Sequence, residues 1–165
     1  MKVGIKNPTI KQKTFVYNPQ TPSGLHPMID YQYFQKSLNH LQAQFLNYQS
    51  LDPALPKLMQ EAVAESVIQR FEVCYDCLWK VLKRYLVEVL GIPEVPNSPK
   101  PIFRLAAENN LLPSAVERWL DYAEARTHTA HDYSGEKAKA CLLLMGDFIR
   151  DATALYQSLS KQTGR

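Results

Sequence analysis

A run of apolar residues spaced three or four positions apart extends from Leu58 to Leu90 and is the longest regular pattern in the sequence. This spacing places the apolar side chains on one face of an α-helix. Gly91 follows, where a glycine can end a helix in a left-handed conformation. At about 1.5 Å per residue the helix would be about 50 Å long, so a bend or an early break is an alternative to one rod. The predicted stripe consists of Val63, Val67, Phe71, Cys74, Leu78, Leu82, Tyr85 and Val89.

Four other segments show helical periodicity, over residues 30–48, 102–109, 114–131 and 134–159. No segment of the body alternates with the two-residue period of a strand. The sequence therefore predicts an all-α fold, an antiparallel up-and-down four-helix bundle with one additional short helix. The residues predicted to face inward are Phe34, Leu38, Leu41, Phe45 and Leu46, then Val116, Trp119, Leu120 and Ala123, and finally Leu142, Met145, Ile149, Ala152 and Tyr156.

Prolines and capping residues set the predicted boundaries of these helices. Pro93, Pro96, Pro99 and Pro101 are expected to form an irregular link before the short helix, because proline lacks a backbone N–H. Ser134 can cap the start of the last helix. The long helices are therefore expected to be joined by one proline-rich link and by shorter connections.

The first 28 residues differ in composition from the rest of the chain. They contain four prolines and two glycines, so an extended basic arm is expected there. Its lysines all precede the first acidic residue, Asp30, and the arm is either a solvated tail or a segment that contacts RNA or a partner protein. The chain is thus predicted to divide into an arm (1–28), a bundle (29–160) and a tail (161–165). The lysines of the arm are Lys2, Lys6, Lys11 and Lys13.

Composition limits the classes of protein to consider. A length of 165 residues fits one domain with a core of its own, and 45 % apolar with 21 % charged residues is typical of globular proteins. No apolar run approaches the roughly 18 residues needed to cross a bilayer, and the first residues lack the pattern of a signal peptide. We therefore expect a cytoplasmic protein without membrane contact.

Three cysteines, an odd number spread over helical sequence, favour reduced thiols over a disulfide framework. Cys74 and Cys77 have the spacing of a zinc knuckle, but no second such pair exists, and the same spacing lies on one apolar face of a helix. A place in the core is the favoured interpretation. We expect no metal and no cofactor.

Polar and titratable residues gather between residues 126 and 133, where two predicted helices meet. Arg126 and His131 are five residues apart, hence about 140° apart around a continuous helix, and do not share a face. For the two to cooperate, the arginine must reach across, the helix must distort near Thr129, or a second copy of the chain must supply one group. A symmetric dimer would build one cleft from two copies of each residue.

Such a cleft has the chemistry needed to act on RNA. A neutral imidazole can take the proton of a ribose 2′-hydroxyl, and a guanidinium can hold two phosphate oxygens while charge builds on them. The structural alternative is that Arg126 pairs with Asp132, Glu124 or a neighbouring carboxylate while His131 caps a helix end. His128 lies one helical turn from Glu124 and Asp132, which favours a salt link. A metal site of His128, His131 and Asp132 is disfavoured by their spacing.

Four motifs resemble those of a known family. The pattern Arg126-x4-His131-x-Tyr133 is similar to the signature of HEPN domains. Residues 68–80 (IQRFEVCYDCLWK), 101–112 (PIFRLAAENNLL) and 119–126 (WLDYAEAR) resemble, in order, segments of the nucleotidyltransferase substrate-binding protein family. The resemblance covers roughly residues 30–160. Without it, Arg70 and Glu72 are expected on a solvated face and Trp79 in the core.

The resemblance implies a helical bundle that dimerises and works with a minimal nucleotidyltransferase. Some HEPN relatives are metal-independent ribonuclease toxins, which would make Arg126 and His131 catalytic. The nucleotidyltransferase can act as antitoxin by adenylylating the motif tyrosine, here Tyr133. Many members carry Asn or Asp directly after the arginine, and Thr127 departs from that pattern, which leaves a supporting polar contact in doubt.

Three functions remain open at this point. The first is a partner of a minimal nucleotidyltransferase, a homodimer or part of a hetero-oligomer, that binds nucleotide or RNA at the cleft. The second is a ribonuclease with His131 as general acid or base, Arg126 as phosphate clamp and Tyr133 as regulatory acceptor. The third is a dimeric interaction domain without catalysis. The residues expected to support binding are Arg104, Thr127, His128 and Asp132.

Overall fold

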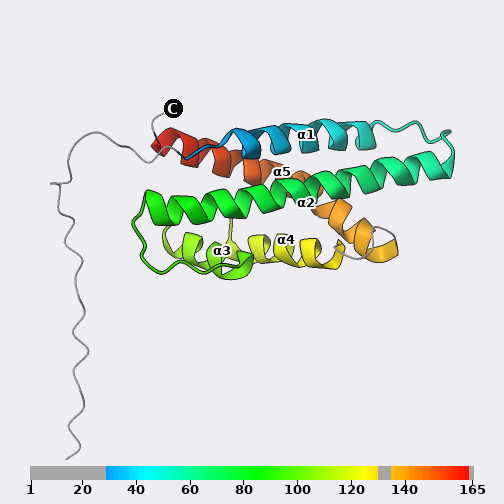
Figure 1. Cartoon of the computed structure of the whole chain (residues 1–165). Helices are drawn as coiled ribbons and strands as arrows, with labels where there is room; N and C mark the ends of the chain where they lie inside the picture. Colours follow the sequence, from blue (N-terminus) through cyan, green and yellow to red (C-terminus); the bar gives the residue numbers. More distant parts are fainter. Residues whose placement is uncertain (1–28, 130–134, 164–165) are drawn as a thin grey trace, which may run out of the picture.

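A computed structural model describes residues 29–129 and 135–163, and within them the chain forms five helices and no strand. Figure 1 shows α1 above α2 and α3 and α4 below it, while α5 runs obliquely behind α2 from the end of α4 to the start of α1. The predicted all-α bundle of four longer helices and one short helix is confirmed. The helices are α1 (Gln32–Gln49), α2 (Lys57–Glu88), α3 (Pro99–Glu108), α4 (Val116–Thr129) and α5 (Gly135–Gln162).

The long helix α2 is continuous over 32 residues and carries the central part of the core. Seven members of the predicted stripe, Val67 to Val89, are buried or pack against the core, and only Val63 at the start lies outside it. Gly91 has φ +67°, and the Ile92 N–H donates to the Leu86 carbonyl at 3.0 Å. This is the predicted glycine stop, because only glycine adopts that conformation without strain.

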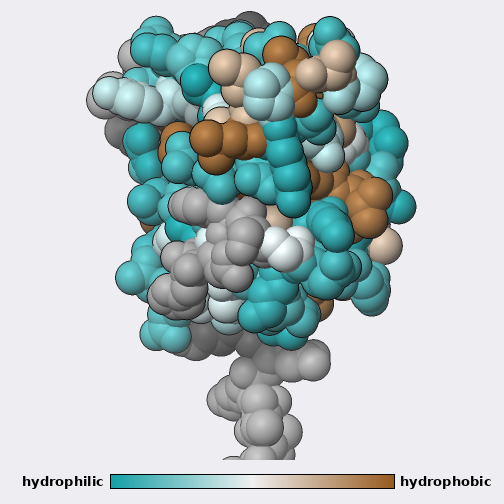
Figure 2. Space-filling view, turned by 90° about the vertical axis from the view of Figure 1, so that its right-hand side faces the viewer, coloured by the Kyte–Doolittle hydropathy of each residue, from teal (hydrophilic) through white to brown (hydrophobic). Residues whose placement is uncertain are grey.

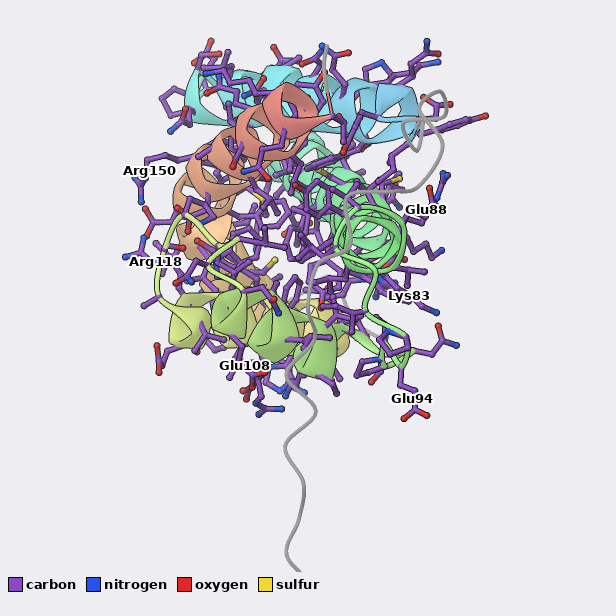
Figure 3. The ribbon with its side chains drawn as sticks, turned by 90° about the vertical axis from the view of Figure 1, so that its left-hand side faces the viewer. Lys83, Glu88, Glu94, Glu108, Arg118 and Arg150 are labelled. Atoms are coloured by element: carbon purple, nitrogen blue, oxygen red, sulfur yellow. The ribbon has the colours of Figure 1, made fainter. Side chains whose placement is uncertain are left out.

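Charged side chains lie at the periphery of the bundle, as the end-on view of Figure 3 shows for six labelled residues. The interior between the helices is filled by apolar and aromatic side chains, among them Phe71, Phe148 and Tyr122, whose rings meet edge to face. Such edge-to-face pairs add to the free energy of burial. None of the helices in the described part of the chain is long and apolar enough to cross a membrane.

Three details differ from the sequence prediction. Pro99 and Pro101 belong to the first turn of α3 and not to the link before it, because the first N–H groups of a helix need no partner. Leu46 is 64 % exposed, since Leu41 and Phe45 already occupy the inner face of α1. Val116, at the first residue of α4, is only half-buried.

Met145 and Ala152 of the predicted α5 stripe are buried as predicted, but at other positions the most buried residue is the one before the predicted one. Phe148 and Leu155 are fully buried, whereas Ile149 and Tyr156 are partly buried beside them. The reason is that α5 packs against α1, α2 and α4 together, so apolar residues cover more than one narrow stripe.

A buried carboxylate joins α4 and α5. Asp151 is 5 % exposed and accepts hydrogen bonds from the hydroxyl groups of Ser114 and Tyr122, each at 2.8 Å. The Trp119 Nε1–H donates to the Ser114 hydroxyl at 2.9 Å. Burial and the hydrogen bond to Asp151 raise the pKa of Tyr122 above its ordinary value, so Tyr122 stays a donor. This network fixes the start of α4 against the middle of α5.

Removing that carboxylate should destabilise the fold. We expect Asp151→Ala to lower the free energy of unfolding by about 3 kcal/mol, because it leaves the buried hydroxyl groups without their acceptor. Asp147→Ala on the same helix removes an exposed carboxylate and should cost less than about 1 kcal/mol. Urea unfolding followed by circular dichroism measures both, and equal losses would contradict the role of Asp151.

Candidate functional site

Arg126 lies in the last turn of α4 and pairs with two carboxylates of α2. Its Nη1 is 3.2 Å from Glu72 Oε1, and its Nη2 is 3.4 Å from Asp76 Oδ2. Glu72 and Asp76 are four residues apart, so they lie on one face of α2. The side chain of Arg126 is 26 % exposed, and the guanidinium is therefore fixed from one side but still reachable by solvent.

Glu72 is the more deeply buried partner and also contacts a second residue of α4. Its side chain is 13 % exposed, against 42 % for Asp76. The hydroxyl of Thr129, which is fully buried, donates to Glu72 Oε1 at 3.0 Å. One carboxylate oxygen thus holds both the guanidinium of Arg126 and the hydroxyl of Thr129. We call the cluster of Arg126, Glu72, Asp76 and Thr129 the Arg126 corner. Glu72 is its anchor, and Asp76 is the more exposed contact of Arg126.

The Nε of Arg126 is buried and has no hydrogen-bond partner among the described residues. An arginine has five N–H donors, and an unpaired buried donor carries a desolvation cost. The guanidinium therefore keeps donor capacity beyond its contacts with Glu72 and Asp76. The structural alternative for Arg126 expected a carboxylate partner, and the two partners come from α2, not from Glu124 of its own helix.

The other predicted site residues divide into described and undescribed ones. His128 is exposed, and its Nε2 lies 3.8 Å from Glu124 Oε1, which is the expected salt link along α4. His131, Asp132 and Tyr133 lie outside the described residues. Their placement beside Arg126 and the cap made by Ser134 stay predictions, and the disfavoured metal site of His128, His131 and Asp132 is not tested.

Thr127 and Arg104 are the remaining predicted supporting residues that the structure describes. The Thr127 hydroxyl donates to the Ala123 carbonyl at 3.0 Å, so its hydrogen bond stays within α4. Thr127 lines a depression at the start of α3 together with Lys100 and Tyr75. Arg104 is exposed on α3 and makes no ion pair within the described part of the chain. A cationic side chain without a local carboxylate remains available for a ligand.

The cysteines have the surroundings of core residues. Burial raises the pKa of Cys74 to about 12, and burial together with the nearby charge of Glu72 raises the pKa of Cys141 to about 12. Both thiols therefore stay protonated at neutral pH and are poor nucleophiles and metal ligands. All three cysteines are free, as predicted. Cys77, like Trp79, is partly buried against the core.

Sequence reasoning missed Glu72 and Asp76 as members of the site. Glu72 was expected on a solvated face, and that prediction is wrong because α4 covers it. The available signal was two carboxylates one turn apart in the middle of the predicted long helix, within the segment that resembles the family. Their partner on another helix could be identified only from the packing of α2 against α4.

Comparisons with known proteins give a consistent set of similarities. The family described as "Nucleotidyltransferase substrate binding protein like" matches residues 29–161. A Haemophilus influenzae protein named "Probable ribonuclease HepT" is 28 % identical over 109 residues, which cover 65 % of this chain and 74 % of that protein.

Two solved structures have a similar fold. A crystal structure of a Thermus thermophilus protein has a TM-score of 0.61 at 28 % identity and covers 80 % of this chain and 99 % of its own. A Haemophilus influenzae structure, described as revealing the fold of a substrate binding domain of a nucleotidyltransferase, has a TM-score of 0.72 at 23 % identity, covering 79 % and 99 %. The bundle is therefore a known fold.

The anchoring role of Glu72 can be tested by its effect on stability. We expect Glu72→Ala to lower the free energy of unfolding by about 2 to 4 kcal/mol, because Arg126 and the buried hydroxyl of Thr129 both lose their acceptor. Glu61→Ala on the same helix removes an exposed carboxylate and should change stability by less than about 0.5 kcal/mol. Chemical unfolding of both variants is the measurement; a negligible loss for Glu72→Ala would refute the anchor.

Proposed function

Because the chain belongs to the nucleotidyltransferase substrate binding protein like family, we propose that it is the HEPN partner of a minimal nucleotidyltransferase and binds nucleotide or RNA around Arg126, His131 and Tyr133. Family membership confirms the resemblance drawn from the four sequence motifs. A protein of the same fold, described as a substrate binding domain of a nucleotidyltransferase, fits this proposal. The functional unit is the bundle over residues 29–160, which the arm over residues 1–28 precedes.

The observation that supports the proposal most directly is the position of the Arg126 guanidinium. Carboxylates of α2 hold it on one side, and solvent can reach it on the other. Glu72 and Thr129 fix its position from α2 and α4, and a quarter of the side chain stays exposed. A fixed guanidinium suits a phosphate, because it offers parallel N–H donors without further loss of side-chain freedom. Asp76, the more exposed carboxylate, is the contact that a phosphate would replace.

A homodimer is part of this proposal, because the family resemblance implies one and because a second copy of the chain is one way for Arg126 and His131 to cooperate. The bundle offers unburied surface for such contact: residues 57–66 of α2 contain no buried side chain. Figure 2 shows apolar residues interspersed with polar ones at the end of the molecule where α1 connects to α2. A symmetric contact there would bring two copies of the site closer together. The exposed apolar residues of this end are Leu46, Leu55, Leu58 and Met59.

The second candidate function is a metal-independent ribonuclease toxin, favoured by the relative named probable ribonuclease. His131 would take the proton of a ribose 2′-hydroxyl, whose oxygen attacks the phosphorus while the bond to the 5′-oxygen breaks, and the leaving 5′-oxygen would gain a proton from a protonated imidazole or from water. Arg126 would stabilise the charge that builds on the phosphate oxygens. The products would be a 2′,3′-cyclic phosphate and a 5′-hydroxyl. Adenylylation of Tyr133 by the partner would then block the cleft.

Supporting roles follow for the remaining polar residues. Arg104 is a phosphate contact beside the cleft, since it has no ion pair within the described residues. His128 and Thr127 are held by contacts within α4 and would support binding from there. Asp132 keeps its predicted supporting role. In the third alternative, a non-catalytic interaction domain, none of these residues contacts a ligand.

Expression of the protein separates the ribonuclease from the binding partner. Under the ribonuclease hypothesis, wild-type protein slows growth and leaves RNA fragments with cyclic phosphate ends, whereas His131→Ala and Arg126→Gln restore growth. Arg150→Gln is the matched control, because Arg150 pairs with Asp147 on α5, and it should act like wild type. Equal growth and intact RNA for wild type and His131→Ala would rule out the ribonuclease hypothesis.

The partner hypothesis predicts a physical and chemical link to the cognate nucleotidyltransferase. Incubated with that enzyme and ATP, the wild-type chain should gain adenylyl groups at Tyr133, and Tyr133→Phe should gain none. Intact-mass and peptide mass spectrometry measure the adduct, and co-purification measures the complex. Absence of both an adduct and a complex would count decisively against this function.

A further inference from the structure

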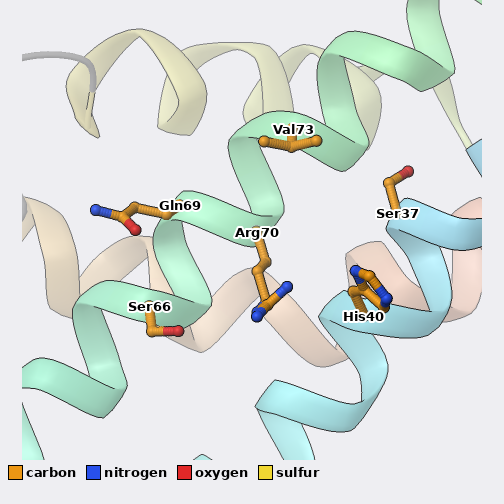
Figure 4. A pocket seen from close by; sticks show the side chains of 6 residues that line it. All are labelled: Ser37, His40, Ser66, Gln69, Arg70 and Val73. Atoms are coloured by element: carbon orange, nitrogen blue, oxygen red, sulfur yellow. The ribbon is translucent and has the colours of Figure 1, made fainter. Parts of the chain in front are cut away.

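A groove separate from the Arg126 corner lies between α1 and α2 and has a volume of about 280 Å³. Arg70, Ser66, Gln69 and Val73 line it from α2, and His40 and Ser37 line it from α1. Figure 4 shows the guanidinium of Arg70 between Ser66 and His40, with the imidazole of His40 reaching toward it from the facing helix. The two helices thus bring an arginine and a histidine to one opening.

The groove contains hydrogen-bond donors and no carboxylate among its lining residues. Arg70 offers guanidinium N–H groups, His40 offers an imidazole N–H in either protonation state, and Ser66 offers a hydroxyl. The hydroxyl of Ser37 is already used, since it donates to the Phe34 carbonyl at 2.8 Å. A positive charge and several donors without a carboxylate favour an anion as the ligand.

The positive charge of Arg70 is not neutralised by any residue of the described part of the chain. Helix α1, which faces the groove, contains no Asp or Glu at all. On α2 the acidic residues near Arg70 lie about 120° to 180° away around the helix axis at 100° per residue. These residues are Glu61, Glu65, Glu72 and Asp76.

Other arginines of the bundle behave differently. Within residues 29–129 and 135–163, four of the six arginines have carboxylate partners, and only Arg70 and Arg104 do not. The sequence of α1 and α2 thus keeps carboxylates away from Arg70, although it supplies two for Arg126. Arg70 has no carboxylate partner in this part of the chain and lies in a groove with other hydrogen-bond donors, so it is suited to bind a negatively charged ligand.

We propose that the groove between α1 and α2 binds a phosphate group of a nucleotide or of an RNA strand, with Arg70 and His40 as its main contacts. The guanidinium would hold two phosphate oxygens, and His40 and Ser66 would donate to the remaining ones. Val73, which is 58 % exposed at the edge of the groove, offers an apolar contact to the attached sugar or base. This site goes beyond the proposed function, because it lies on the other side of α2 from Glu72 and needs neither Arg126 nor His131.

The proposal can be tested by a ligand titration in which the signals of residues that line the groove are measured. The full-length chain would be titrated at constant ionic strength with pyrophosphate, with adenosine monophosphate and with a single-stranded oligonucleotide of 2′-O-methyl RNA. Nuclear magnetic resonance signals of the Val73 methyl groups and the His40 ring report binding at this place. We expect both residues to shift in wild type, and the relative affinities of the three probes distinguish a free nucleotide from a strand.

Variants decide which residues hold the phosphate. We expect Arg70→Gln to weaken binding, measured by the Val73 shift, by at least about tenfold, and His40→Gln to weaken it several-fold, because each loses a hydrogen bond to a charged group. Arg150→Gln is the control for loss of an exposed positive charge and should bind like wild type. Circular dichroism verifies that each variant is folded.

Two results would overturn the proposal. One is the absence of any Val73 or His40 shift with all three probes. The other is an unchanged affinity in Arg70→Gln. If Arg126→Gln abolishes binding of every probe while Arg70→Gln does not, the phosphate binds at the Arg126 cleft, so the proposed function stands and the groove proposal fails.

Discussion

The contact of Glu72 with Arg126 and Thr129 links the middle of α2 to the end of α4, and the geometry of the candidate site depends on it. A carboxylate that is 13 % exposed accepts from a guanidinium and from a fully buried hydroxyl. Such a buried charge is stable only when its partners are in place. The end of α4, just before the motif histidine, is therefore fixed by a residue 54 positions earlier in the chain.

Helix α2 separates its charges around its axis, and this separation gives the molecule two different faces. Two of its acidic residues, Glu72 and Asp76, meet Arg126 of α4. Arg70 points toward α1, which carries no acidic residue. The carboxylates on one side of α2 thus hold Arg126 in place, whereas Arg70 on the other side has no carboxylate partner among the described residues. A single rigid helix holds both at a fixed separation.

The helices and most of their buried faces could be predicted from the sequence, because helical periodicity is a local property of neighbouring residues. The stripe of α2 and its stop at Gly91 are the clearest examples. The buried face of α5 was predicted only in part, at Met145 and Ala152, because its burial depends on three neighbouring helices. The partners Glu72 and Asp76 of Arg126 were not predicted either, since an ion pair between helices depends on how those helices pack. The resemblance to a family pointed to Arg126, but the contacts that hold it required the fold.

We propose that Arg126 is anchored by Glu72 and exchanges its contact with Asp76 for a phosphate. The most direct measurement is a crystal structure of the wild-type chain with a non-cleavable 2′-O-methyl dinucleotide. Our account predicts a phosphate oxygen at about 3 Å from the Arg126 guanidinium, with the Glu72 contact kept and the Asp76 contact broken. A structure in which the bound dinucleotide does not contact Arg126, and both carboxylate contacts persist, would contradict it.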